Sequence, residues 1–176
     1  MKKFLTYLFI FLLVVCLYIL QIFVIDGHSL FGLKPNLLLI SVVTVSLWYG
    51  LYVGSIYSFI IGFITDLIFG SYGQFTICYS IVGCIIGFLN YNYRKENKVA
   101  LLYVTALATC IFEFSQYILF IFKTTSYISV IYLLKHIIIA SLLNICIAYI
   151  IYGILYKITE KLDDDIYDKV SYESLR

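Results

Sequence analysis

Charged residues are scarce in this sequence. Asp, Glu, Lys and Arg make up 12% of its 176 residues, and hydrophobic residues make up 63%. An average soluble domain has about 25% charged and 45–50% apolar residues. The mean hydropathy is +1.01. A chain of one-domain length with so little charge leaves no room for a separate soluble domain, so the composition indicates an integral membrane protein.

Motifs of catalysis and nucleotide binding are also missing. The sequence has no P-loop, no Rossmann glycine fingerprint, no G-x-S-x-G elbow and no H-E-x-x-H pair. The formal net charge is only +2, and the basic residues are scattered between segments rather than gathered into one patch. This distribution argues against nucleic-acid binding. We expect neither enzyme activity nor a cofactor.

The cysteines show no metal-binding pattern. Each of the five lies inside an apolar run, and no C-x-x-C occurs. We expect buried packing residues rather than metal ligands, because no His or carboxylate stands nearby at ligand spacing. The five are Cys16, Cys78, Cys84, Cys110 and Cys146. We also expect no metal at the acidic run of the C-terminal tail and no function for the loop residue His28.

Six apolar runs dominate what is present. They predict an all-α integral membrane protein with six transmembrane helices in residues 1–156, followed by a short charged tail, 157–176. The predicted spans are residues 4–25, 35–49, 51–69, 74–93, 99–122 and 127–156. The first run is too long for a signal-peptide core and has no cleavage site after it, so we interpret it as an uncleaved span. Pro35 opens the second span, and Gly50 makes a tight turn into the third.

The distribution of Lys and Arg predicts the orientation. With both termini in the cytoplasm, nine basic residues lie inside and two, Lys34 and Lys123, lie outside. Positively charged loops stay in the cytoplasm, so this count favours both termini inside. The nine are Lys2, Lys3, Arg94, Lys95, Lys98, Lys157, Lys161, Lys169 and Arg176.

Small residues form a row with a spacing of four in the third predicted span. The row consists of Gly50, Gly54, Ser58, Gly62, Asp66 and Gly70. Residues at this spacing share one ridge of a helix, so the row makes a shallow groove between large apolar side chains. In lipid, such a groove lets a second backbone approach closely. Gly83 and Gly87 repeat the pattern in the fourth span.

The groove and Asp66 leave three alternatives open. The row is a helix-packing seam with Asp66 capped by a neighbour, or Asp66 is an intramembrane ion or proton site, or the row is a face for another membrane protein. The third alternative does not exclude the first. We expect Gly62→Leu to disrupt the bundle or its complex, because a large side chain would force the backbones apart.

Three other polar residues fall inside predicted spans. Glu113 lies near the middle of the fifth span, and Lys135 and His136 lie in the sixth. Asp66 and Lys135 both belong to the outer half of the membrane in the predicted orientation, so we expect that they could pair. Glu113 needs Lys135, His136 or a proton to be tolerated at that depth. A structural ion pair between Glu113 and His136 is favoured over an acid–base pair.

The stretch from Lys34 to Leu89 resembles the rod shape-determining MreD family. The resemblance is carried by Lys34-Pro35-Asn36-Leu37-Leu38-Leu39-Ile40, by Gly50-x-x-x-Gly54, by Gly62 to Gly73 and by Tyr79 with Gly83-x-x-x-Gly87. It implies a non-enzymatic, multi-pass protein of the bacterial cytoplasmic membrane that takes part in cell-wall elongation. Such a protein would bind MreC and connect MreB filaments to RodA and a class B penicillin-binding transpeptidase.

A second family has the same size and span number. Substrate-binding S components of energy-coupling-factor vitamin transporters also have six helices and a glycine-rich third helix, and they usually carry an Ala-x-x-x-Ala face on the first helix. The first predicted span here has no alanine. This difference, together with the small number of polar residues available for a pocket, favours the scaffold interpretation.

Overall fold

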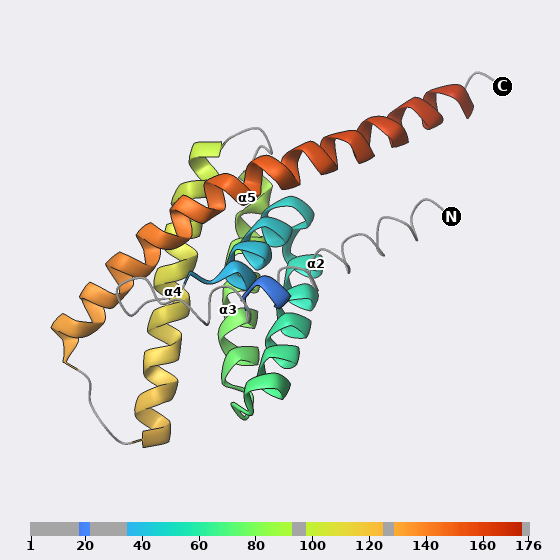
Figure 1. Cartoon of the computed structure of the whole chain (residues 1–176). Coiled ribbons are helices and arrows are strands. Elements are labelled where there is room, and N and C mark those ends of the chain that lie inside the picture. Colours follow the sequence, from blue (N-terminus) through green and yellow to red (C-terminus); the bar gives the residue numbers. More distant parts are fainter. Residues whose placement is uncertain (1–17, 22–34, 93–97, 125–128, 174–176) are drawn as a thin grey trace.

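The computed structural model describes residues 18–21, 35–92, 98–124 and 129–173. The elements in these residues are helices, and they pack side by side as a bundle (Figure 1). They are α2 (Leu37–Phe69), α3 (Gln74–Phe88), the short 3-10 helix η2 (Leu89–Asn92), α4 (Lys98–Thr124) and α5 (Val130–Glu173). The all-α prediction is confirmed for this part of the chain.

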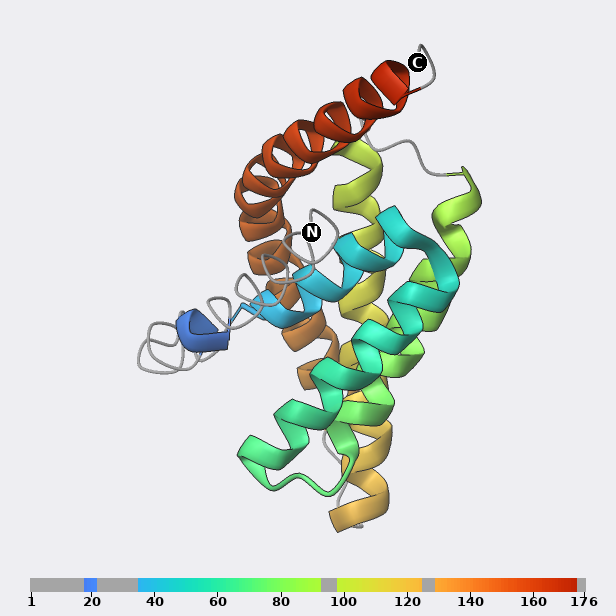
Figure 2. The same cartoon turned by 90° about the vertical axis from the view of Figure 1, so that its right-hand side faces the viewer.

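Helix α2 is bent sharply at Gly50. This residue has φ 81° and ψ −171°, a conformation that is essentially restricted to glycine. The first half of α2 crosses the other helices obliquely, and after Gly50 the chain turns back beside α3 (Figure 2). The carbonyl of Leu47, in the last turn before the bend, accepts a hydrogen bond from the Asn90 amide of η2. Gly50 is therefore the turn that the sequence predicted.

The first half of α2 forms the centre of the bundle. From Leu37 to Leu47 every residue except Val45 is buried. Asn36 caps this half helix, because its Oδ1 accepts a hydrogen bond from the N–H of Leu39 at 2.9 Å. Residues of α2, α3 and α4 complete the apolar core around it, including Ile61, Cys78, Tyr79, Val82, Ile86, Leu101 and Phe112.

The prediction of six separate spans is wrong for the described residues. Three helices are long and apolar enough to cross a membrane: Leu37–Phe69, Val99–Thr124 and Val130–Ile151. The predicted spans 35–49 and 51–69 are the two halves of α2, and the first half is too short, at about 1.5 Å per residue, to cross about 30 Å of hydrocarbon. Helix α3 has 15 residues and is shorter than a usual span. The predicted span 4–25 lies outside the described residues except for 18–21.

Most of the predicted sixth span and residues 157–173 of the predicted tail form one helix. Helix α5 has 44 residues, and its C-terminal part leads away from the other helices (Figure 1). The outer faces of α4 and α5 are apolar and exposed, with Tyr103, Phe114 and Phe122 on α4 and Tyr132, Ile138 and Leu142 on α5. Apolar side chains on the outside are typical of a helical bundle that faces lipid.

Candidate functional site

The glycine groove lies where α2 and α3 pack against each other. We use this name for Gly50, Gly54, Ser58 and Gly62 of α2 together with Gly83 and Gly87 of α3, all of which are buried. A Cβ atom built on Gly62 would lie 2.5 Å from the Cα of Thr76, and one built on Gly87 would lie 2.8 Å from the Cα of Leu51. Real Cβ atoms do not approach a backbone so closely. The two helix backbones are therefore in direct contact along the groove.

The groove also joins the two halves of α2. A Cβ atom on Gly54 would lie 2.8 Å from the Cα of Ser46, which belongs to the half before the bend. A Cβ atom on Gly83 would collide with the side chain of Ser58 and lie 2.9 Å from the Gly54 carbonyl oxygen. The two halves of α2 and helix α3 thus approach one another closely through small residues. Gly70, the last member of the predicted row, is exposed and has nothing within 4 Å of its Cβ position.

Asp66 caps the start of α3. Its Oδ1 accepts a hydrogen bond from the N–H of Phe75 at 3.0 Å, and its Oδ2 accepts one from the N–H of Thr76 at 2.7 Å. The hydroxyls of Ser71 and Thr76 donate to the same carboxylate. The residue at the usual capping position is Gly73, which has no side chain, so Asp66 provides the acceptor from the preceding helix. A negative charge at a helix N-terminus is also stabilised by the helix dipole.

These hydrogen bonds agree with the packing alternative for Asp66. The expected pairing with Lys135 is not found, because the Asp66 carboxylate is turned toward the first turn of α3 and Lys135 lies exposed on α5. Asp66 and Gly62 are one helical turn apart and both meet Phe75 and Thr76. Groove and cap therefore fix the same end of α3.

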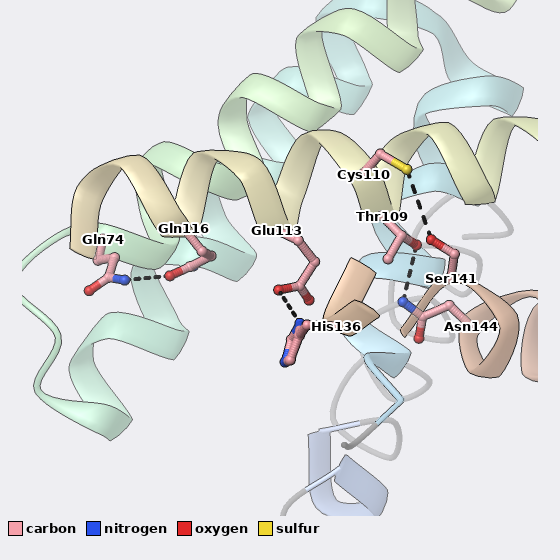
Figure 3. Close-up of polar contacts among 8 residues, drawn as sticks. All are labelled: Gln74, Thr109, Cys110, Glu113, Gln116, His136, Ser141 and Asn144. Carbon is pink, nitrogen blue, oxygen red and sulfur yellow. Dashed lines mark hydrogen bonds and ion pairs between the residues drawn. The ribbon is translucent and has the colours of Figure 1, made fainter. Parts of the chain in front are cut away.

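One face of α4 carries polar side chains toward its neighbours (Figure 3). Glu113 Oε2 lies 3.4 Å from Nδ1 of His136 on α5, so the structure brings together the two residues that the sequence favoured as an ion pair. Gln116 lies one turn further along and accepts a hydrogen bond from the Gln74 amide of α3. Thr109 lies one turn before Glu113 and accepts a hydrogen bond from the Asn144 amide at 3.1 Å.

Asn36 and Asn144 connect the helices through a network that sequence reasoning missed. The backbone N–H of Asn36 donates to Asn144 Oδ1 at 2.8 Å, across 108 residues of sequence. Tyr79 donates from its hydroxyl to Asn36 Oδ1 at 3.0 Å. Asn144 is 2% exposed, so its amide is a buried hydrogen-bonding group that joins α2, α4 and α5. The only signal in the sequence is the presence of an Asn inside an apolar run.

The cysteines do not form a site in the described residues. Cys78 is buried, as expected, whereas Cys84, Cys110 and Cys146 are exposed, so the prediction of burial is wrong for these three. Their exposed faces belong to the apolar outside of the bundle, where a thiol behaves as a small hydrophobic group. In the part of the chain that the structure describes, no three His, Cys, Asp or Glu side chains come together as metal ligands would.

Comparison with known protein families identifies this arrangement. A family model described as rod shape-determining protein MreD matches residues 1–162. Comparisons with curated proteins and with solved structures gave no match. The matched region contains the glycine groove, the Asp66 cap and the polar face of α4, and it covers most of the 176 residues. The chain therefore belongs to the MreD family of rod shape-determining membrane proteins.

Proposed function

We propose that this protein is a non-enzymatic scaffold of the bacterial cell-wall elongation complex. It would bind MreC and thereby link MreB filaments to RodA and a class B penicillin-binding transpeptidase. The observation that carries this proposal is the family match over residues 1–162, since the family is one of shape-determining components. The helical bundle would span the cytoplasmic membrane several times, with both termini in the cytoplasm, and would itself provide the binding surface.

The arrangement of polar groups supports binding rather than turnover. The carboxylate of Asp66 is occupied by hydrogen bonds from the start of α3, and Asn144 is occupied by Asn36 and Thr109. Glu113 and His136 contact each other. Among the described hydrogen bonds, none joins either residue to a serine, cysteine or threonine that could act as a nucleophile. These contacts hold helices together, which is the requirement for a scaffold.

The outer surface supports contact with lipid and with other membrane helices. Large apolar side chains cover the exposed faces, such as Phe59 and Phe63 of α2, which stack with ring centroids 6.4 Å apart. A membrane helix of MreC would find apolar surface of this kind on α2, α4 or α5. The glycine groove would act indirectly, by keeping the bundle in the shape that MreC recognises.

Depletion of the protein in a rod-shaped bacterium tests this proposal. We expect depleted cells to become round, and we expect an affinity-tagged copy to retain MreC when it is purified from membranes. Unchanged rod shape, or a tagged copy that restores shape but does not retain MreC, would contradict the proposal. Vitamin binding to the purified protein at nanomolar concentration would favour a transporter S component instead.

A further inference from the structure

A cavity of about 450 Å³ lies between α2, α3 and α4 beside Glu113. We call it the Glu113 cavity. Phe69 and Phe75 provide an aromatic lining, and the described polar lining residues are Gln21, Asn36, Thr65, Ser71, Tyr79 and Glu113. Sites for small organic ligands have volumes of about 300–1,000 Å³, with apolar walls and a few well-placed polar groups. The Glu113 cavity has this size and this composition.

The polar groups of the cavity are held in place by the surrounding protein. Gln21 donates to the carbonyl of Pro35 at 3.1 Å and accepts from the N–H of Leu37 at 2.8 Å. Tyr79 donates to Asn36 Oδ1. His136 contacts Glu113 through one carboxylate oxygen. A ligand would thus meet a lining that is already ordered, which lowers the entropic cost of binding.

The charge of the lining selects the class of ligand. Glu113 is the one ionisable carboxyl group among the described lining residues, and none of them is Lys, Arg or His. The start of α2 also borders the cavity, but its N–H groups at Asn36, Leu37 and Leu39 already donate to protein side chains. An anion would therefore find neither a positive charge nor these donors. A single carboxylate is also a poor site for a divalent metal, which needs several oxygen ligands.

The aromatic wall favours an organic cation over an inorganic one. Phe75 lies between Phe69 and Tyr79, with ring centroids 6.1 and 6.3 Å away. The ring of Phe112 packs against that of Tyr79, with ring centroids 4.8 Å apart. Faces of aromatic rings attract ammonium groups, and the attraction is stronger where water is excluded. A carboxylate and aromatic rings in one lining are a combination suited to binding amines.

We propose that the Glu113 cavity binds an organic cation, an ammonium group carried on an apolar or amphipathic body. The ammonium would lie near Glu113, and the body would lie along Phe69, Phe75 and Tyr79. Such a group can belong to a soluble amine or to the headgroup of an aminophospholipid. This site is separate from the scaffold proposal, because cell shape could depend on the protein whether or not the cavity is filled.

Binding of benzylammonium to the purified full-length protein tests the proposal. Isothermal titration should show binding of benzylammonium and binding at least about tenfold weaker of benzyl alcohol, which has the same ring but no charge. Equal affinities for the two, or no binding of benzylammonium up to about 10 mM, would overturn the proposal. This comparison needs no substitution and therefore does not depend on the folding of a variant.

Two variants locate the site. Glu113→Gln should weaken benzylammonium binding about tenfold or more, because the charge is lost while the shape is kept. Glu160→Gln makes the same chemical change in the C-terminal half of α5, a helix that contributes no residue to the described lining, and should leave binding unchanged. A loss of binding as large in Glu160→Gln as in Glu113→Gln, or an unaltered affinity in Glu113→Gln, would overturn the proposal.

Native mass spectrometry distinguishes the two sources of the amine. If the source is a lipid headgroup, phosphatidylethanolamine but not phosphatidylglycerol should remain bound, and benzylammonium should displace it. If the source is a soluble amine, neither lipid should be retained while benzylammonium binds. Retention of phosphatidylglycerol in preference to phosphatidylethanolamine, without competition by benzylammonium, would contradict a cation site.

Discussion

At the scale of single residues, Asp66 carries the clearest energetic consequence. Its carboxylate accepts hydrogen bonds from Phe75 and Thr76, so the first turn of α3 depends on a side chain from α2. Asp66→Asn keeps one acceptor oxygen and places an amide N–H opposite a backbone donor. We expect a loss of about 1–3 kcal/mol in stability, measured by thermal unfolding in detergent, because a buried donor loses its partner.

A double-mutant cycle with Lys135→Gln provides the control. Lys135 is exposed and does not contribute to the Asp66 cap, so the two substitutions should act additively. A coupling energy above about 0.5 kcal/mol would show that the two charges interact after all. An Asp66→Asn protein as stable as the wild type would show that the cap contributes nothing.

Gly62 sets the distance between α2 and α3. Because the Cα of Thr76 lies 2.5 Å from the position of a Cβ atom on Gly62, even alanine requires the backbones to move apart. We expect Gly62→Ala to cost about 1–3 kcal/mol and Gly62→Leu to prevent stable folding. Gly153 of α5 is the matched control, since nothing lies within 4 Å of its Cβ position. Equal melting temperatures for Gly62→Ala and Gly153→Ala would contradict close backbone packing.

At the scale of elements, the bend in α2 decides the architecture. Gly50 has φ 81° and ψ −171°, which side chains with a Cβ atom do not tolerate. Gly50→Ala should destabilise the protein by about 1–3 kcal/mol through backbone strain. Thermal unfolding beside Gly153→Ala measures the difference. An unchanged stability would show that the bend in α2 does not depend on the backbone conformation that glycine allows at position 50.

We expect the hydrogen bonds of Asn144 to stabilise the packing of α2, α4 and α5. Asn144→Leu leaves the N–H of Asn36 without its acceptor and removes the hydrogen bond that the Thr109 hydroxyl accepts, so we expect a loss of about 1–3 kcal/mol. Ser141→Ala, one turn earlier on α5, removes only a contact of 3.9 Å with Cys110 and should change stability little. Similar effects of the two substitutions would argue that the network is not important for stability.

The sequence predicted the elements better than their arrangement. Hydropathy located the helices and the turn at Gly50, because apolar runs and glycine leave local signals. It could not show that residues 35–49 form a buried half helix, since a segment surrounded by protein is as apolar as one surrounded by lipid. The contact of Glu113 with His136 was predicted from charge, whereas that of Asn36 with Asn144 joins neutral residues far apart, and an Asn inside an apolar run does not indicate its partner.

At the scale of the whole molecule, helices α2 to α5 are joined to one another by the contacts described above. The glycine groove and the Asp66 cap bind α3 to α2, and the polar face of α4 joins these helices to α5. A protein whose helices are fixed in this way can present a constant outer surface to a partner such as MreC. Its proposed role as a scaffold therefore depends on packing inside the bundle.

The most direct test exchanges Gly62 in living cells. In a rod-shaped bacterium that depends on this protein, Gly62→Leu should give round cells and should no longer retain MreC, while Gly153→Leu should preserve both shape and MreC binding. Rod-shaped cells that retain MreC with a stably produced Gly62→Leu protein would contradict the account.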